Sequence, residues 1–178
     1  MAQATHPSTD PGIEPNPDGD PTGRVPGAAA FPLDPRLEAD TRAVAALPSG
    51  TLRLVDDARW FWAVIVPHRA SASELHHLPD TERAALMDDV ARLSEAVEAI
   101  TACRSVNVGM LGNVVPQLHV HVVARHEGDP AWPGPVWGHG APEPMADGEA
   151  RQRAGALRGK LGLDREPHGR APSEGVTR

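Results

Sequence analysis

Several residue types are scarce in this chain, and each shortage excludes a class of protein. A single cysteine, Cys103, stands among the 178 residues, so an internal disulfide framework is excluded. No run of residues has the length and continuous apolarity of a membrane-spanning helix, and the N-terminus lacks the basic and apolar segments of a secretory signal. We therefore expect a soluble, cytoplasmic protein that does not associate with a membrane.

Basic residues are outnumbered by acidic ones. Lys and Arg total 17 against 24 Asp and Glu, which gives a formal net charge of -7. An acidic chain is poorly suited to bind DNA or RNA through broad electrostatic attraction. A small anionic ligand that a few local donors bind remains compatible with this charge.

Aromatic residues are also rare: the chain has four Trp, two Phe and no Tyr. Residues 60–62 are all aromatic, and Trp132 and Trp137 flank a loop rich in proline. Aromatic rings can hold such a loop in place where backbone ladders end. We expect the two tryptophans to anchor this loop to the folded domain.

The length fits one domain with a sizeable core. Residues 1–30 are rich in Pro, Gly and Asp and nearly free of large apolar side chains, so we predict a disordered tail there. Residues 31–140 carry the periodic apolar patterns and are predicted to form the domain. Residues 141–178 are predicted to be a loosely structured tail with a weak helix, because glycines interrupt the helical pattern at 149–163.

Local signals place helices and strands within the domain. Asp34 can cap a helix in which Pro35 takes the first position and which ends by Leu47. Residues 51–55 and 60–66 are β-prone runs joined by a short, mostly polar connection, which is the pattern of a hairpin. The second run is apolar throughout, as expected for a central strand.

A long helix capped by Asp80 is predicted. Before it, Ser71 and Glu74 match a capping box for a short helical turn. After Asp80, apolar residues recur at alternating steps of four and three, which predicts one apolar face: Leu86, Val90, Leu93, Val97 and Ile100. We expect this face to pack on a sheet.

The run 117–123 places two imidazoles among hydrophobic residues. Successive side chains of an extended strand alternate between faces, so His119 and His121 point the same way, about 7 Å apart along the strand. Each imidazole must find a partner or stay hydrated, which makes the pattern costly for a purely structural strand. The pattern therefore favours a functional site.

Another strand is predicted at 104–110, with Asn107 on its polar face. Gly112 and Asn113 supply a turn signal between this strand and the histidine strand. We expect the two strands to form a hairpin that brings Asn107 close to the imidazoles. There Asn107 could contact a ligand or simply satisfy the backbone at the hairpin edge.

The order of these elements and motifs resembles the histidine triad superfamily of nucleotide-binding hydrolases and transferases. The resemblance rests on residues 106–113 and 117–125, which are similar to a signature of histidines alternating with apolar residues. Upstream, residues 64–69 and 77–78 resemble the family's apolar strand, proline and basic loop. The likeness covers about residues 33–138 and leaves both tails unexplained.

The resemblance implies an α+β, HIT-like fold, in which two main helices pack on a meandering antiparallel sheet of about four to five strands. It also implies a homodimer, a small-molecule nucleotide as ligand, and no cofactor or metal. His119 would attack the α-phosphorus of the nucleotide, and His121 would donate to a phosphate oxygen. A nucleobase could stack on Trp132 or Trp137, although we favour anchoring for both rings.

Four further residues are candidate substrate contacts on the same resemblance: Asn107, Asn113, Gln117 and Arg125. Of these, Arg125 is expected at the exposed end of the histidine strand. His126, which follows it, is expected to be exposed as well.

Three positions depart from the family's pattern. The first triad position holds Gln117, which cannot deliver a proton as a general acid. Val114 stands where many relatives have Ser or Thr, and Arg53 aligns with a position where several relatives have another histidine. Without an acid the leaving group must depart as a stable anion, which favours dinucleoside polyphosphates and similar phosphoanhydrides over other substrates.

Two other functions stay open. Strand histidines at i and i+2 can offer two nitrogen ligands to a metal ion, although Cys103, Glu127 and Asp129 have no compelling geometry as a third ligand. The second open function is a nucleotide-binding module without catalytic activity, because Gln117 and Val114 replace chemically active side chains.

Overall fold

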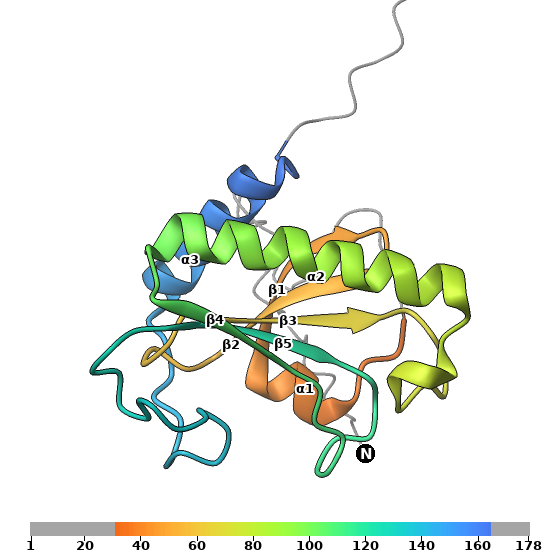
Figure 1. Cartoon of the computed structure of the whole chain (residues 1–178), viewed down its shortest axis with the longest axis horizontal. Coiled ribbons are helices and arrows are strands. Elements are labelled where there is room, and N and C mark those ends of the chain that lie inside the picture. Colours follow the sequence, from red (N-terminus) through yellow and green to blue (C-terminus); the bar gives the residue numbers. More distant parts are fainter. Residues whose placement is uncertain (1–30, 165–178) are drawn as a thin grey trace, which may run out of the picture.

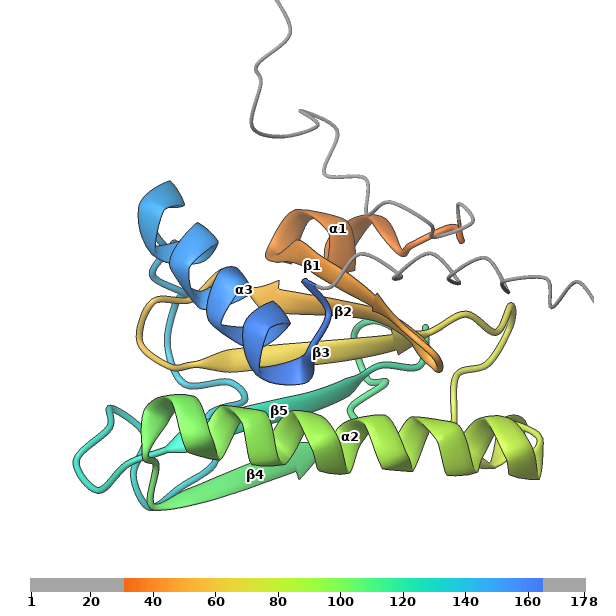
Figure 2. The same ribbon diagram turned by 90° about the horizontal axis from the view of Figure 1, so that it is seen from above.

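The computed structural model describes residues 31–164, which form a five-stranded antiparallel sheet with helices on both faces. Helices α2 and α3 cover one face, and the short helix α1 lies on the other (Figures 1 and 2). The architecture confirms the predicted α+β class and antiparallel sheet. The disordered tail predicted at 1–30 lies outside the described residues. In chain order the elements are α1 (Pro35–Asp40), β1 (Thr41–Leu47), β2 (Gly50–Val55), β3 (Trp62–Pro67), the 3-10 turn η1 (Leu75–His77), α2 (Asp80–Thr101), β4 (Ser105–Gly109), β5 (Val120–Arg125) and α3 (Asp147–Leu161).

Strand order determines where the histidine strand lies. Strands β1, β2 and β3 form a meander, and α2 then carries the chain to the far edge, where β4 begins. Strand β5 returns between β3 and β4 and pairs with both. The predicted β4–β5 hairpin is therefore present, and the residues of β5 are held by hydrogen bonds on both sides.

The core fills the space between the sheet and helices α2 and α3. Strand β5 contributes Val120, Val122 and Ala124, all buried on this face. Helix α2 contributes four of the five residues at the predicted spacing as buried side chains, and Ile100 packs partly buried beside them. Each fully buried aliphatic side chain contributes about 1.5–3 kcal/mol of transfer free energy. The alternation thus sends Val120, Val122 and Ala124 into this core, whereas His121 and Val123 lie on the opposite face.

The helix predicted to run to Leu47 was wrong in its length. Asp34 does cap α1, since its carboxylate accepts from the backbone N–H of Arg36 at 2.8 Å, but the helix ends at Asp40. The next seven residues form strand β1, paired along its length with β2. Pairing with a neighbouring strand has outweighed the helix propensity of an alanine-rich segment.

The capping box predicted at Ser71 and Glu74 was also wrong. Ser71 has a positive φ of 64°, and the Glu74 side chain makes no capping hydrogen bond. The turn that follows is the short 3-10 element η1. The long helix α2 is present, but Asp80 is its first residue and not its cap, so the predicted cap was wrong. Pro79 takes the capping position, and Asp80 forms an ion pair with Arg83 at 2.6 Å.

Helix α3 is a regular element where the sequence predicted a loose tail. Its small and apolar residues Ala150, Ala154 and Leu157 are buried in the core. Arg153 ties it to the β2–β3 connection by donating to the backbone oxygens of Trp60 and Ala58 at 2.5 and 2.9 Å. Tertiary packing therefore stabilises a helix whose glycines weaken its intrinsic propensity.

Among residues 31–164, none of the helices combines the length and apolarity needed to cross a lipid bilayer.

Candidate active site

His119 and His121 lie side by side on the sheet face that α2 and α3 leave uncovered. Their ring centroids are 4.7 Å apart, and the ring planes are nearly perpendicular. In the sheet, His121 pairs with Val64 of β3 and with Gly109 of β4. The structure therefore brings the two imidazoles together on one face of the sheet, as the alternation predicts.

A backbone group two residues earlier in the chain orients the ring of His119. Its Nδ1 lies 2.7 Å from the carbonyl oxygen of Gln117. A carbonyl oxygen can only accept, so Nδ1 carries the proton of the neutral ring and Nε2 keeps its lone pair. His119 is 6% exposed. Within residues 31–164 its Nε2 has no hydrogen-bond partner, and this atom is not fully buried. A nucleophilic nitrogen is thus available on the face opposite to the core.

His121 is enclosed by aromatic rings. Its Nδ1 accepts a hydrogen bond of 3.0 Å from the indole N–H of Trp62. The rings of Trp62 and Trp137 lie 5.4 and 5.7 Å from the imidazole. Burial, together with the nearby charge of His119 when protonated, lowers the pKa of His121 to about 3. His121 is therefore neutral at physiological pH.

Gly109 makes room for Trp137 beside His121. A Cβ atom at this position would come within 2.9 Å of two atoms of the indole ring. Trp137 also packs edge-on against Trp62, with 6.1 Å between centroids. The second loop tryptophan, Trp132, is 36% exposed and lies 5.7 Å from the guanidinium of Arg125.

Arg125 does not lie at an exposed strand end, so that expectation was wrong. The side chain is 1% exposed and forms an ion pair with Asp129 at 2.8 Å. It also donates to the side-chain oxygen of Asn107 and to the backbone oxygen of Gly134, both at 2.8 Å. A buried cation is stable only with such partners. Arg125 and Asn107 thus hold the 129–134 loop against the hairpin, and His126 is exposed as expected.

The side-chain amide of Gln117 forms hydrogen bonds with the segment that leads into α1. Its Oε1 accepts from the backbone N–H of Asp34 at 2.8 Å, and its Nε2 donates to the backbone oxygen of Pro32 at 3.0 Å. Arg53, another substituted position, donates to the hydroxyl and the backbone oxygen of Thr41 at 2.5 and 3.1 Å. Two of the three departures from the family pattern therefore fasten α1 to the open face, one at each end of the helix.

The β4–β5 loop carries the remaining candidates. Asn113 and Val114 are both exposed, Val114 by 69%. Arg36 of α1 reaches this loop, where its Nη1 lies 3.4 Å from the backbone oxygen of Val114. Sequence reasoning missed Arg36, because only the placement of α1 on the open face brings its cation there.

A cavity of about 320 Å³ opens on the same face, with Trp62 between it and His121. The cavity is enclosed by the end of α1, the end of β2 and the loop 136–144. Among its lining side chains are Ala39, Val55, Val136 and His139. Its lining also includes the carboxylates of Asp40, Asp56 and Asp57 and the guanidinium of Arg59, so apolar and charged groups are mixed in it.

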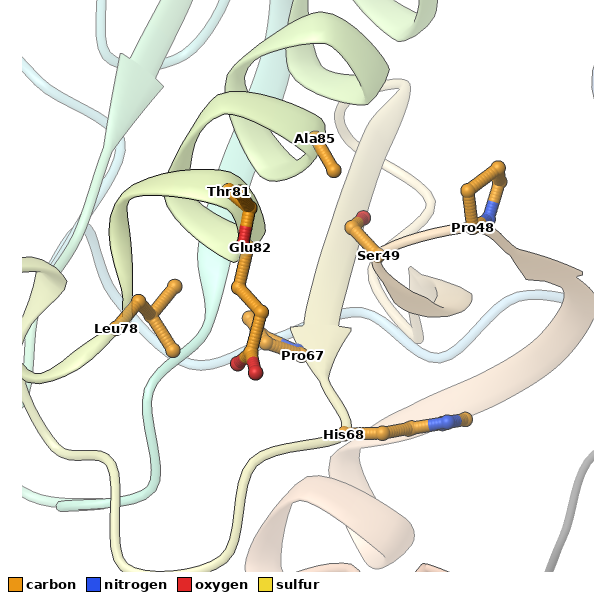
Figure 3. Close-up of a pocket in the computed structure, with 8 residues that line it drawn as sticks. All are labelled: Pro48, Ser49, Pro67, His68, Leu78, Thr81, Glu82 and Ala85. Carbon is orange, nitrogen blue, oxygen red and sulfur yellow. The ribbon is translucent and has the colours of Figure 1, made fainter.

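A second cavity, of about 240 Å³, lies between the β1–β2 turn, the end of β3 and the first turns of α2 (Figure 3). Its two titratable side chains are already paired, Glu82 with Arg69 at 3.2 Å and His68 with Thr51 at 2.6 Å. Neither cavity is lined by His119 or His121, but the first is lined by Trp62, the hydrogen-bond partner of His121, so the candidate site remains the open face of the sheet.

Within the described part of the chain, no group of three or more His, Cys, Asp and Glu side chains could hold a metal ion. The metal-binding alternative thus has only the two strand histidines to rest on. Cys103 is buried in the helix-side core.

Comparison with known proteins agrees with this arrangement. The sequence model of the HIT domain family matches residues 36–128. A histidine triad protein from Sinorhizobium meliloti is similar at 41% identity and a TM-score of 0.72, over 74% of this chain and 97% of that one. One from Bradyrhizobium japonicum is also 41% identical, with a TM-score of 0.72, over 75% and 99%. A third, from Marinobacter aquaeolei, is 35% identical with the same TM-score, over 75% and 97%.

No curated protein matches this chain. The match to the domain family over residues 36–128 and the identity and coverage of the three similar structures nevertheless show the family. The chain belongs to the histidine triad (HIT) family.

Proposed function

We propose that this protein is a nucleotidyl hydrolase or transferase in which His119 is the nucleophile. The observation that carries the proposal is the hydrogen bond between His119 Nδ1 and the Gln117 carbonyl oxygen, 2.7 Å long, which leaves Nε2 with its lone pair. A neutral imidazole held in this way is a competent nucleophile near pH 7 and needs no separate base.

In the first step the Nε2 lone pair forms a bond to the α-phosphorus of the nucleotide. The bond between this phosphorus and the bridging atom breaks, and its electron pair leaves with the rest of the substrate. His121 donates a hydrogen bond to a non-bridging oxygen, where negative charge increases. In the second step water or another acceptor attacks the same phosphorus, the N–P bond breaks, Nε2 recovers its electron pair, and the attacking oxygen loses a proton to solvent.

The contacts of Gln117 support a preference for phosphoanhydrides. Its amide is engaged with Asp34 and Pro32, and an amide cannot protonate a departing oxygen. A phosphate or polyphosphate chain leaves readily as an anion without such help. We propose dinucleoside polyphosphates as the best substrates, with nucleoside phosphoramidates slower because the departing nitrogen requires a proton.

Two features of the open face support a nucleotide as ligand. The cavity of about 320 Å³ beside Trp62 can receive the nucleoside, and Asp40 at its edge can accept from a ribose hydroxyl. Arg36, next to the β4–β5 loop, supplies a cation for the phosphate chain in a protein whose net charge is -7. The Asn107 amide nitrogen has no hydrogen-bond partner among residues 31–164 and can donate to a substrate oxygen, whereas Arg125 supports the site from beneath the loop.

A second copy of this chain is the partner that we propose for the exposed edge of the sheet. Strand β4 lies at that edge, where Val108 and Met110 are 44% and 37% exposed. An apolar edge strand is a ready surface for pairing with another strand. Sedimentation at micromolar concentration should show a dimer that Val108→Lys converts to a monomer, and a monomeric native protein would contradict the pairing.

The function is tested by turnover of diadenosine tetraphosphate and of adenosine phosphoramidate. His119→Ala should lower kcat by about 10⁴-fold or more, as expected when a nucleophile is removed. His126→Ala is the matched control, because this exposed histidine follows the same strand outside the site. Equal turnover by native protein and His119→Ala would refute the proposal.

The non-catalytic alternative makes a different prediction for the same samples. It is favoured by Gln117, whose side chain serves only to hold Pro32 and Asp34. Tight binding of AMP without turnover of either substrate would establish a nucleotide-binding module instead.

A further inference from the structure

The indole of Trp62 makes a hydrogen bond to His121 that has no role in the two reaction steps proposed above. Its indole N–H donates to Nδ1 of His121 over 3.0 Å, and both side chains are buried, at 9% exposure each. The two residues sit on adjacent strands, since Trp62 pairs with Val123 while His121 pairs with Val64. The contact is thus fixed by the register of β3 and β5.

The chemistry of indole determines where His121 keeps its proton. The N–H of tryptophan can donate but cannot accept, so the nitrogen that it meets must be unprotonated. A neutral imidazole carries one proton, which therefore resides on Nε2 of His121. His119 has the opposite arrangement, since its Nδ1 donates to a carbonyl oxygen. Neighbouring histidines on one strand thus present a bare Nε2 and a protonated Nε2.

We propose that Trp62 is a positioning residue that keeps His121 in the tautomer with its proton on Nε2, so that His121 donates to the phosphate beside the nucleophile. This inference rests on the proposed function. Without the indole N–H, His121 can place its proton on either nitrogen, and one tautomer offers the phosphate a lone pair that repels it. Trp62 itself touches neither the substrate phosphorus nor the leaving group in this scheme.

The surroundings of His121 support a neutral ring rather than a second cation. His119 is the titratable group in ring contact with it, and Trp137 and Gly109 complete the contacts from the loop and from β4. Arg125, further along the same strand, is paired with Asp129. Burial and the proximity of His119 both lower the pKa of His121, which agrees with the hydrogen bond from Trp62.

Trp137 offers a matched control for the hydrogen bond. Its ring lies 5.7 Å from His121, about as near as the 5.4 Å of Trp62. Its own N–H is buried and has no partner within residues 31–164. Trp137→Phe therefore removes indole packing against His121 without removing a hydrogen bond, whereas Trp62→Phe removes both.

The first test is nitrogen NMR of the histidine rings in the full chain without substrate. In native protein, His121 should show a protonated Nε2 and an unprotonated Nδ1, unchanged between about pH 5 and pH 9. Trp62→Phe should mix the two tautomers, while Trp137→Phe should keep the native pattern. A native spectrum with the proton on Nδ1, or with a ring that charges in that range, overturns the inference whether or not the variants fold.

The second test is turnover of diadenosine tetraphosphate. Trp62→Phe should lower kcat by about tenfold, the scale of one neutral hydrogen bond, whereas Trp137→Phe, which keeps that hydrogen bond, should not. Native kcat and a native tautomer in Trp62→Phe would overturn the inference while leaving the reaction intact. Native protein that forms no nucleotidyl adduct would instead overturn the proposed function, and with it the catalytic role of Trp62, even if the NMR result is as expected.

Discussion

The sheet face under α2 and α3 is built almost entirely from aliphatic side chains, whereas the opposite face carries histidine, tryptophan and arginine in specific contacts. On the helix side, Leu52, Ile65 and Val122 are fully buried among other apolar residues. On the open side, His121 and Arg125 are also buried, but each depends on particular donor or acceptor atoms. One face is stabilised by the aliphatic volume it buries, and the other by oriented polar groups beside a smaller apolar cluster of Trp60, Trp62, Val123 and Val136.

The difference predicts how each face responds to substitution. A core contact can be weakened without changing the direction in which any reacting group points. A polar contact on the open face can be lost at modest cost in stability and still misplace an imidazole. We expect the largest effect from the buried ion pair of Arg125 and the smallest from the exposed Arg36.

Removing the counterion of Arg125 should have the largest effect on stability. Asp129→Ala leaves a buried guanidinium without its carboxylate, which should cost about 3–5 kcal/mol of unfolding free energy. Burial alone would raise the pKa of Asp129, but hydrogen bonds, with Arg125 foremost, lower it well below its usual range. This stabilisation is fully present above the unfolded pKa of about 3.9 and is lost as pH falls toward the folded pKa.

Urea unfolding of native protein and Asp129→Ala at several pH values checks this prediction. The difference between the two should stay constant from about pH 5 to pH 8 and shrink only below about pH 4. A difference that already vanishes near neutral pH would show that the ion pair does not stabilise the open face.

Truncation in the core should lower stability by a similar or smaller amount than the loss of Asp129. It should not change the orientation of the histidines. Leu93 of α2 is fully buried, so Leu93→Ala should cost about 2–5 kcal/mol through lost transfer free energy and a residual cavity. At a temperature where the variant remains folded, its kcat should match that of the native protein. A loss of kcat without a loss of stability would break the distinction between the two faces.

Gln117→Ala should show a small loss of stability and little loss of chemistry. Two neutral hydrogen bonds to Asp34 and Pro32 disappear, which should cost about 1–3 kcal/mol in thermal unfolding. Because the amide does not transfer a proton, kcat should change by no more than a few-fold. A hundredfold fall in kcat with an unchanged Tm would mean that Gln117 acts directly on substrate.

Arg36→Ala should have the smallest effect. This exposed side chain makes one long contact, at 3.4 Å, so stability should not change measurably. We expect KM for diadenosine tetraphosphate to rise by about threefold at low salt and the difference to fade as salt screens the charge. An unchanged KM at low ionic strength would remove Arg36 from the phosphate site.

Elements with local signals could be predicted from the sequence. The hairpin of β2 and β3, helix α2 and the histidine strand each follow an alternation or a helical repeat that neighbouring residues display. Strand β1 could not be predicted in this way, because residues 41–47 contain good helix formers and become a strand only by pairing with β2. Helix α3 likewise depends on packing that its glycine-interrupted sequence does not reveal.

In the candidate site, too, some features follow from local sequence and others depend on contacts between distant segments. The shared direction of His119 and His121 follows from strand alternation alone. The partner of His121 is 59 residues away at Trp62, and the segment that Gln117 holds is 83 residues away at Asp34. Arg125 was expected at an exposed strand end, because the loop that folds back over it gives no local signal. Contacts between distant segments require the fold before they can be recognised.

The central claim is that His119 Nε2 forms a covalent bond to the nucleotide, and a quenched reaction tests it most directly. Native protein mixed with diadenosine tetraphosphate, stopped within one turnover and digested under mildly basic conditions, should yield a peptide containing His119 that carries an added AMP mass. The adduct should be absent from His119→Ala and should disappear on acid treatment. Turnover without any adduct on that peptide, or with the AMP mass on a different residue, would contradict the account.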